Sequence, residues 1–359
     1  MSTKRMLTGD RPTGKLHLGH YVGSIRNRVR LQREHDGFFL LADVHMLTTK
    51  NAKQDIASVA QNARHVVLDA LTAGIEPERA TFYLQSGIPE IGDLNALLQN
   101  LVTVPRLERI PSLKDVLRDA GLAEMPYGLL GYPVLLAADV LGMKAQVVPV
   151  GKDIAPHVEV AREIARRFNS QYGETFPVPE LISSDAPTLP GTTGQSKMSK
   201  SLDNAIYLSD DAQAVQEKVM RMDLDPGRTD AARPGAVEDH PIFVYHRLFN
   251  ADVAEVEDLK TRYRAGRVGD AEVKEKLAAA INRLLEPMLE RRARFEHDDG
   301  LIDRLIFEGT QRARRQIQQT VSEARTAMGF TAVFNRIRGR AEQSRPATPS
   351  AAVMGATDA

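Results

Sequence analysis

The sequence predicts an α/β protein in which a domain built on a parallel sheet is followed by a mainly α-helical C-terminal domain. Short apolar runs alternate with long amphipathic stretches over the first half of the chain, as strands and helices do in α/β folds. The second half carries helical patterns and few strand signals. With 359 residues, the chain is long enough for two domains that each have a core.

Four short apolar runs are predicted to be the strands, at residues 5–8, 38–43, 81–85 and 147–150. Pro149 in the last run indicates a strand end or an irregularity. Helices are predicted between and after the strands at 19–35, 54–73 and 156–168, with Gly74 as a C-cap of the second. Strands joined through helices of this length imply right-handed crossovers, and therefore a Rossmann-like parallel sheet.

The two predicted domains meet near residue 208. Residues 1–208 are expected to form the Rossmann-like catalytic domain, and residues 209–340 a helical domain with helices at 211–222, 253–264, 270–290 and 302–328. Residues 341–359 end in a stretch rich in Ala, Pro, Ser and Thr, which can bury too little apolar area to fold by itself. We expect a disordered tail there.

The composition excludes several classes of function. Lysine and arginine, 47 in all, balance 47 aspartates and glutamates, so any RNA contact must be a local patch. The absence of cysteine excludes disulfides, cysteine-ligated zinc and a thiol nucleophile. No run approaches the roughly 20 apolar residues of a membrane span. We therefore expect a cytoplasmic protein with no membrane segment and no dedicated metal site.

The segment from Pro12 to His20 carries the first chemical signature. A glycine-rich turn leaves the first predicted strand and brings His17 and His20 to one face of a starting helix. The free N–H groups of a helix N-terminus favour phosphate, and imidazoles can donate hydrogen bonds to it. Gly19 lacks a side chain, which leaves space for a flat base. Taken alone, the segment is equally well explained as a turn with two surface histidines.

The segment from Lys197 to Ser201 carries the second signature and lies in a stretch rich in Gly, Ser and Thr, which predicts a flexible loop. Lys197 and Lys200 would supply positive charge to a departing pyrophosphate. A loop of this kind can close on a triphosphate and open again. An ordinary solvated loop is the alternative for this segment alone, but together with His17 and His20 it indicates an ATP-dependent adenylating enzyme.

The two signatures resemble the HIGH and KMSKS motifs of the class I aminoacyl-tRNA synthetases. Further segments are similar to the tryptophanyl-tRNA synthetase family, in the order of that family, at residues 8–14, 42–45, 136–141, 148–153 and 188–191. The resemblance implies a ligase that activates L-tryptophan with ATP to tryptophanyl-adenylate and pyrophosphate and then charges tRNA(Trp). It also implies Mg²⁺ carried by ATP and pyrophosphate, and a homodimer.

The resemblance implies roles for the matched positions. Catalysis would involve His17, His20, Lys197 and Lys200, and ATP would contact Arg11, Pro12, Thr13, Gly19, His20, Gly151, Lys152, Asp153, Leu189, Lys197, Met198, Ser199, Lys200 and Ser201. Tryptophan would contact Leu7, His45, Tyr132, Leu136, Asp139, Val148 and Val150. Asp139 is the expected indole partner, because an indole N–H only donates and an unpaired buried carboxylate disfavours substrates that lack it.

Ile154 and Asp10 are unusual residues for such a site. Ile154 stands where the family usually has a glutamine that contacts the α-amino group of the substrate, which implies altered amino-acid binding or another partner for the ammonium. Asp10 places a negative charge beside a phosphate site, where it should repel unless it points away.

Alternatives to the main interpretation remain at this point. A synthetase-derived accessory or regulatory protein that binds tryptophan or a modified tryptophan is one, and a tyrosyl-tRNA synthetase or a small nucleotidylyltransferase is another. The helical domain is expected to recognise tRNA through basic clusters, namely Arg291, Arg292 and Arg294, then Arg312, Arg314 and Arg315, and finally Arg336, Arg338 and Arg340.

Overall fold

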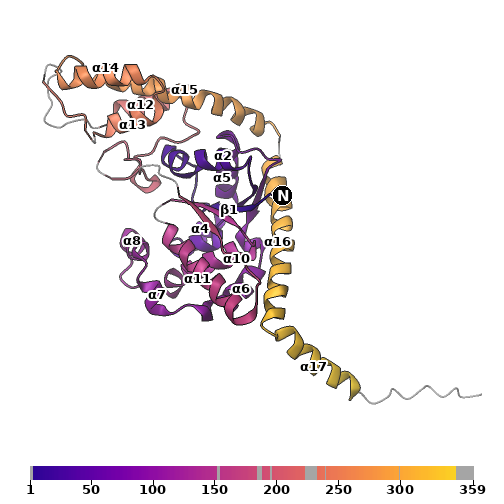
Figure 1. Cartoon of the computed structure of the whole chain (residues 1–359). Helices are drawn as coiled ribbons and strands as arrows, with labels where there is room; N and C mark the ends of the chain where they lie inside the picture. Colours follow the sequence, from indigo (N-terminus) through magenta and orange to yellow (C-terminus); the bar gives the residue numbers. More distant parts are fainter. Residues whose placement is uncertain are drawn as a thin grey trace, which may run out of the picture.

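A five-stranded parallel sheet with the order β3-β2-β1-β4-β5 forms the centre of the molecule (Figure 1). The computed structural model describes residues 3–151, 154–183, 188–194, 196–222, 233–238, 240–298 and 300–344. Its strands are β1 (Arg5–Asp10), β2 (Asp36–Leu41), β3 (Ala80–Leu84), β4 (Val147–Val150) and β5 (Glu180–Ser183). The prediction of a parallel sheet is confirmed, but β5 was missed, because this short edge strand has no buried apolar run.

Helices connect the strands and cover both faces of the sheet (Figure 1). In the amino-terminal half these elements are α1 (Leu18–His20), η1 (Tyr21–Ile25), α2 (Arg26–Leu31), α3 (Asp43–Met46), α4 (Lys53–Ala57), α5 (Val59–Thr72), η2 (Gln85–Gly87), α6 (Glu90–Leu98), η3 (Gln99–Leu101), α7 (Val104–Glu108), α8 (Pro111–Asp119), α9 (Tyr127–Leu130), α10 (Tyr132–Gly142) and α11 (Ala155–Tyr172). The second half contains η4 (Lys200–Leu202), α12 (Ala212–Met220), α13 (Pro241–Phe249), α14 (Val253–Arg264), α15 (Asp270–Glu296), α16 (Leu301–Ala327) and α17 (Phe330–Gln343).

Two predicted helices differ in detail from the structure. The helix expected at 19–35 contains the π-helical turn η1 directly after His20, and such turns are frequent at functional sites. The helix expected at 54–73 is interrupted at Ser58, whose hydroxyl donates to the Asp55 carbonyl at 2.7 Å. Gly74 closes it as predicted, with φ of 114°, because this backbone conformation suits glycine.

Two apolar cores lie on opposite faces of the sheet. Successive strand residues point to opposite sides, so Met6 joins one core and Leu7 the other. The first core contains residues of α5 and of the helices α12 to α15, whereas the second contains residues of α6, α10, α11 and α16. No helix within the described ranges combines the length and hydropathy that crossing a bilayer requires.

Helix α16 returns from the predicted helical domain to the sheet. It packs against β3, and Ala313, Ile317 and Val321 are buried in the second core. Gly309 allows the close approach, because a Cβ at this position would overlap the backbone carbonyl of Phe82. Helices of the predicted second domain therefore share both cores with the first, α12 to α15 the first core and α16 the second, and the division near residue 208 stays a prediction.

The end of the described chain contains a helix that the sequence analysis did not predict. Helix α17 projects away from the rest of the molecule (Figure 1), and Ala341 to Gln343, which were predicted to begin a tail, belong to it. Residues 345–359 of that predicted tail lie outside the described residues.

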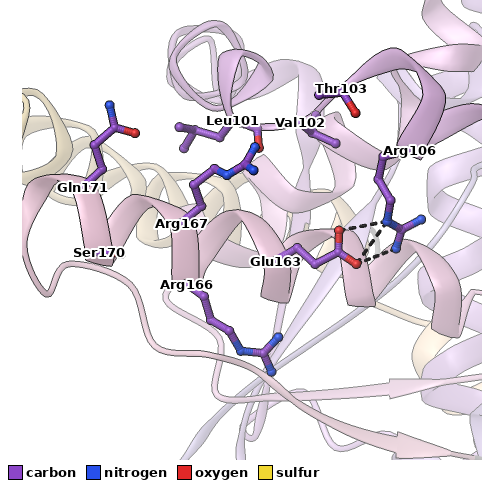
Figure 2. A pocket seen from close by; sticks show the side chains of 9 residues that line it. All are labelled: Leu101, Val102, Thr103, Arg106, Glu163, Arg166, Arg167, Ser170 and Gln171. Atoms are coloured by element: carbon purple, nitrogen blue, oxygen red, sulfur yellow. Dashed lines mark hydrogen bonds and ion pairs between the residues drawn. The ribbon is translucent and has the colours of Figure 1, made fainter.

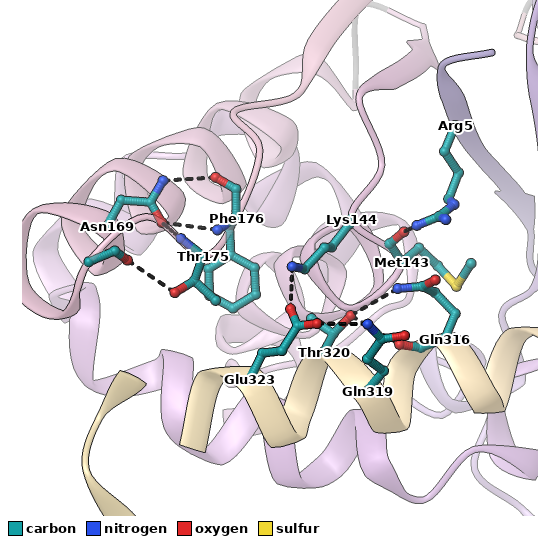
Figure 3. Close-up of polar contacts among 11 residues, drawn as sticks. Arg5, Met143, Lys144, Asn169, Thr175, Phe176, Gln316, Gln319, Thr320 and Glu323 are labelled. Atoms are coloured by element: carbon teal, nitrogen blue, oxygen red, sulfur yellow. Dashed lines mark hydrogen bonds and ion pairs between the residues drawn. The ribbon is translucent and has the colours of Figure 1, made fainter. Parts of the chain in front are cut away.

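Polar contacts attach α16 to the segment that leads into β4 (Figure 3). Lys144 forms an ion pair with Glu323, which also accepts a hydrogen bond from Gln319 at 2.9 Å. On the other side of the same segment, the Arg5 guanidinium donates to the Met143 carbonyl at 2.5 Å. These contacts fix the start of β4, and the carboxyl end of β4 leads into Gly151 of the predicted site.

Candidate active site

The strand order places the predicted ATP site where ligands usually bind in such sheets. From β1 the chain proceeds through β2 to β3 on one side and then places β4 and β5 on the other. The carboxyl ends of two strands at such a switch point open a crevice that binds ligands. Arg11 to Thr13 follow β1 and Gly151 follows β4, while Lys152 and Asp153 lie outside the described residues.

The backbone joins the two sequence signatures directly. The Leu18 amide donates to the Ile206 carbonyl at 2.9 Å, and the Leu208 amide donates to the Leu16 carbonyl at 3.0 Å. Residues 206–208 follow the predicted lysine loop closely in the chain, so these hydrogen bonds hold the loop beside the histidine segment. Gly19 touches both signatures, since a Cβ there would lie 3.0 Å from the His17 ring and 3.6 Å from the Cβ of Met198.

The imidazole rings of His17 and His20 are in contact, with centroids 3.8 Å apart and planes tilted by 49°. Burial lowers the pKa of His17 to about 2 and that of His20 to about 4, so both imidazoles are neutral at pH 7. Nδ1 of His20 accepts a hydrogen bond from the His17 amide at 3.2 Å. This bond assigns the proton of neutral His20 to Nε2, which can therefore donate to a phosphate oxygen.

Lys200 of the lysine loop reaches the glycine-rich turn after β1. Its Nζ donates to the Gly14 carbonyl at 2.8 Å and lies 3.4 Å from the Thr13 hydroxyl. Gly14 has φ of 115°, which L side chains rarely adopt. Burial lowers the pKa of Lys200 to about 8, although the charges of Asp10 and Asp69 oppose the decrease.

Asn204 organises the lysine loop and was missed by the sequence analysis. Its buried side chain accepts from the Ser199 amide at 2.8 Å and donates to the Ser196 hydroxyl at 3.2 Å. Its carbonyl accepts from the Thr192 amide at 2.9 Å. No sequence pattern distinguishes this residue from any loop asparagine, because its contacts exist only once the loop is folded.

Leu189 and Met198, predicted to lie near the nucleotide, are adjacent across the loop. The Met198 amide donates to the Leu189 carbonyl at 2.9 Å, and both side chains are buried in the first core. Lys197 pairs with Pro190 in an antiparallel bridge. The backbone of Ser201 lies in η4.

The negative charge of Asp10 is compensated within the chain. Arg28 of α2 forms an ion pair with its carboxylate, lies 3.3 Å from Oδ1 through the other guanidinium nitrogen, and donates to the Gly9 carbonyl at 3.1 Å. Burial by itself would raise the pKa of Asp10, but the charge and hydrogen bonds of Arg28 lower it overall. Asp10 thus forms an ion pair with Arg28, and this pairing reduces the repulsion of a phosphate that was expected from the sequence.

The predicted tryptophan contacts come together around a buried carboxylate. Asp139 is almost fully buried, and its Oδ2 lies 2.8 Å from Nε2 of His45. Burial raises the pKa of Asp139, and the hydrogen bonds from His45 and Gln85 oppose the increase. The other members of the predicted set are buried in the second core or packed against it, namely Leu7, Tyr132, Leu136, Val148 and Val150.

Gln85 is a further residue of this pocket that the sequence analysis did not identify. Its amide nitrogen donates to both oxygens of Asp139, at 2.9 and 3.0 Å, and its carbonyl oxygen accepts from the amides of Val44 and His45 at 3.2 Å each. The sequence placed Gln85 at a strand end, where a polar residue carries no specific signal. The structure shows that it orients Asp139.

Ile154 is the N-cap residue of α11 and packs against the second core. Polar groups lie one turn further along this helix, where His157 Nε2 is 2.8 Å from the Ser112 hydroxyl. The ring of His157 meets Tyr132 edge to face, with centroids 5.2 Å apart. Hydrogen-bonding side chains therefore lie one helical turn from Ile154, although Ile154 itself offers none.

Several arginines that were expected to form RNA-binding clusters are engaged within the chain. Arg291 donates to the Thr72 carbonyl at 2.8 Å, and Arg292 donates to Asp69 at 2.6 Å. Two arginines of α16 also form ion pairs, Arg312 with Asp36 at the start of β2 and Arg314 with Glu90 at the start of α6. Arg291 and Arg292 are half-buried, whereas Arg312 and Arg314 are exposed despite their ion pairs. The other members of the clusters are exposed as well, namely Arg294, Arg315, Arg336, Arg338 and Arg340.

A groove of about 710 Å³ lies between η3, α7 and α11 (Figure 2). The Arg106 guanidinium binds both carboxylate oxygens of Glu163 there, with Nε to oxygen distances of 2.9 and 3.1 Å. None of the predicted site residues lines this groove. The predicted ATP-site residues within the described part of the chain lie instead at the ends of β1 and β4 and on the loop that carries Lys200.

Comparison with known proteins gives results that agree with this geometry. The family described as "tRNA synthetases class I (W and Y)" matches residues 2–286. The chain is 53% identical over 328 residues to a tryptophan–tRNA ligase of Treponema pallidum (strain Nichols), covering 91% of this chain and 97% of that protein. It is 50% identical to one of Borreliella burgdorferi (strain ATCC 35210 / DSM 4680 / CIP 102532 / B31), covering 96% and 98%.

Among solved structures, a tryptophanyl-tRNA synthetase from Campylobacter jejuni, complexed with ADP and tryptophan, superposes with a TM-score of 0.77 and 31% identity. The match covers 90% of this chain and 99% of that one.

Proposed function

The chain belongs to the class I tRNA synthetases for tryptophan and tyrosine and is a tryptophan–tRNA ligase, and on this basis we propose that its ATP site lies between the His17–His20 segment and the Lys197–Ser201 loop. The enzyme activates L-tryptophan with ATP to tryptophanyl-adenylate and pyrophosphate, then transfers the tryptophanyl group to tRNA(Trp). The observation that supports the location of the site best is the contact of Lys200 with Gly14.

The proposed roles follow from the chemistry of adenylation. The carboxylate of tryptophan attacks the α-phosphorus of ATP, and the bond from that phosphorus to the pyrophosphate oxygen breaks. Neutral His20, protonated on Nε2, would donate a hydrogen bond to a phosphate oxygen. The positive charge of Lys200 would stabilise the negative charge that develops on the departing pyrophosphate. Lys197 lies on the same loop and would also stabilise the negative charge of the pyrophosphate. The enzyme needs no covalent nucleophile, so rate depends on alignment and electrostatic stabilisation.

Asp139 is proposed to accept the indole N–H of tryptophan. His45 and Gln85 already bind its two oxygens, but a carboxylate has about four acceptor positions. These three hydrogen bonds hold the carboxylate in one orientation before the substrate arrives. Phenylalanine cannot donate to Asp139, so the carboxylate would disfavour it.

Mg²⁺ is proposed to enter with ATP. The two carboxylates whose charges act on Lys200, Asp10 and Asp69, are both paired with arginines, so neither is free to hold an ion there. The phosphate oxygens would carry it, and when bound it would neutralise part of the triphosphate charge. A homodimer and a cytoplasmic location are further parts of the proposal, supported by the family's resemblance.

A second candidate function rests on Ile154, which packs against the core and offers no hydrogen bond to an α-ammonium group. Under this alternative the protein is an accessory member that accepts a modified tryptophan or regulates rather than supplies charged tRNA. The polar group of His157 and Ser112 beside Tyr132 supports the main function, because it offers other partners for the ammonium.

Tryptophan-dependent exchange of pyrophosphate into ATP, followed by charging of tRNA(Trp), tests both functions. We expect exchange with L-tryptophan and charging of the tRNA. Exchange with ring-substituted tryptophan only would support the accessory function. No exchange with either amino acid would contradict the proposed ATP and tryptophan sites, provided that circular dichroism shows folded protein.

A further inference from the structure

A buried carboxylate outside the predicted site connects the histidine segment to the helical part of the chain. Asp69 lies on α5 and its side chain is fully buried. Its Oδ2 accepts a hydrogen bond from the Leu16 amide at 2.7 Å, and its Oδ1 accepts from the Arg292 guanidinium at 2.6 Å. Arg292 lies on the last turns of α15. One carboxylate thus binds both the start of the signature segment and a helix more than 200 positions later.

The contact fixes the backbone of Leu16, the residue that immediately precedes His17. The Leu16 amide is held by Asp69, and the Leu16 carbonyl is held by the Leu208 amide at 3.0 Å. His17 follows directly, and its amide donates to Nδ1 of His20 at 3.2 Å. A shift of the Leu16 amide would therefore move the hydrogen bond that sets the tautomer of His20.

Two further contacts join helix α5 to α15 and α16, near the corner where these two helices meet (Figure 1). Arg291 donates to the Thr72 carbonyl at 2.8 Å, and Arg64 donates to Asp303 at 2.7 Å. These contacts lie on either side of Asp69 in the sequence of α5. A change in the position of the α15–α16 corner would thus act on α5, and through it on Leu16.

Electrostatics give Asp69 a further connection to the site. Burial raises its pKa, while the hydrogen bonds from Leu16 and Arg292 oppose the increase. Its charge also acts on Lys200, whose pKa it raises. Without Arg292 the buried charge of Asp69 would have no ion-pair partner, which costs free energy in an apolar core. The Arg292 ion pair therefore stabilises the charged carboxylate that holds the Leu16 amide.

We propose that Asp69 is a positioning residue for adenylation, which fixes the Leu16 backbone and makes its position depend on Arg292 of helix α15. The inference rests on the proposed adenylation at the His17–His20 segment. Asp69 touches neither ATP nor tryptophan in this account. It acts by aligning the histidine segment, and displacements of about 1 Å in such segments lower rates by up to a hundredfold.

The test compares Asp69→Asn, Arg292→Met, the double variant and Arg292→Lys in tryptophan-dependent pyrophosphate exchange. Active sites are counted by the burst of adenylate formation, so that kcat refers to folded enzyme. We expect each single variant to lower kcat about tenfold and to change KM for tryptophan less than twofold, because the tryptophan pocket lies on the other face of the sheet. The double variant should lose no more than either single one, and Arg292→Lys should recover part of the loss.

Arg283→Met is the matched control, because Arg283 is an exposed arginine of the same helix, and it should keep wild-type kcat. Hydrogen exchange at the Leu16 amide gives a second readout, which we expect to accelerate in Arg292→Met even if that variant is only partly active. Wild-type kcat per active site in Asp69→Asn and Arg292→Met, with or without a lower Tm, would overturn the inference and leave Asp69 a structural residue. Absence of exchange in the wild-type enzyme would instead overturn the proposed function itself.

Discussion

The lowered pKa of Lys200 makes a specific prediction about how adenylation depends on pH. Its Nζ is held at the Gly14 carbonyl in a buried position, and burial lowers its pKa from 10.5 to about 8. A lysine is charged below its pKa and neutral above it. The positive charge that would stabilise the departing pyrophosphate is therefore present at pH 7 and is lost as the pH rises through about 8, roughly two and a half pH units below the pKa of an exposed lysine.

The magnitude follows from the fraction of protonated lysine. With a pKa of about 8, about nine tenths of Lys200 is charged at pH 7 and about one tenth at pH 9. We therefore expect kcat/KM for ATP in pyrophosphate exchange to fall about tenfold between these pH values, because kcat/KM reports groups of the free enzyme. The profile of kcat should fall less, since bound phosphate favours the charged lysine.

Lys200→Arg separates this lysine from other groups that titrate in the same range. A guanidinium stays charged throughout, so the variant should show a flat profile from pH 7 to 9 even if its overall rate is lower. Lys15→Arg is the control, because Lys15 is an exposed lysine of the same turn, and it should keep the wild-type shape. A wild-type profile that stays flat to pH 9, or a fall of equal size in Lys200→Arg, would refute the assignment to Lys200.

Three further predictions follow from the described contacts. Asp139→Ala should raise KM for tryptophan by about 10- to 100-fold and reduce its preference over phenylalanine; exchange with each amino acid measures this, and an unchanged preference would place indole recognition elsewhere. Asn204→Ala should lower kcat about tenfold with little change in KM for tryptophan, because the loop loses its hydrogen bonds through the Ser199 amide; a wild-type kcat would contradict this. Gly309→Ala should lower the free energy of unfolding by about 1–3 kcal/mol, because its Cβ would overlap the Phe82 carbonyl; urea denaturation followed by circular dichroism measures the change, and wild-type stability would exclude the close approach of α16 to β3.

The extent to which sequence predicted the site differs from residue to residue. His17, His20 and Lys200 were predicted because residue type and spacing along one short segment carry the signal, and the structure places both segments beside each other. Asp139 was predicted from the resemblance to the family and from the chemistry of the indole N–H, which only donates. Gln85 and Asn204 were not predicted, because their importance comes from contacts with residues that are distant in sequence or folded into a loop.

The fold shows the same distinction. Long helices and buried strands produce periodic patterns of apolar residues, so β1 to β4 and most of the long helices were expected. Strand β5 was not, because an exposed edge strand of four residues produces no such pattern. The basic clusters were also interpreted from local composition, whereas Arg292 and Arg312 bind Asp69 and Asp36 far away in the chain.

The sequence by itself determined which chemistry to expect of this protein, because the two signatures, the proposed indole acceptor and the alternation of strands and helices are local patterns that can be recognised without coordinates. The tertiary structure alone decided how those parts act on one another. It paired Asp10 with Arg28, oriented Asp139 with His45 and Gln85, and attached Leu16 to α15 through Asp69. The physical reason is that burial and ion pairing depend on which distant segments meet, and those contacts set the charge, tautomer and position of each catalytic group.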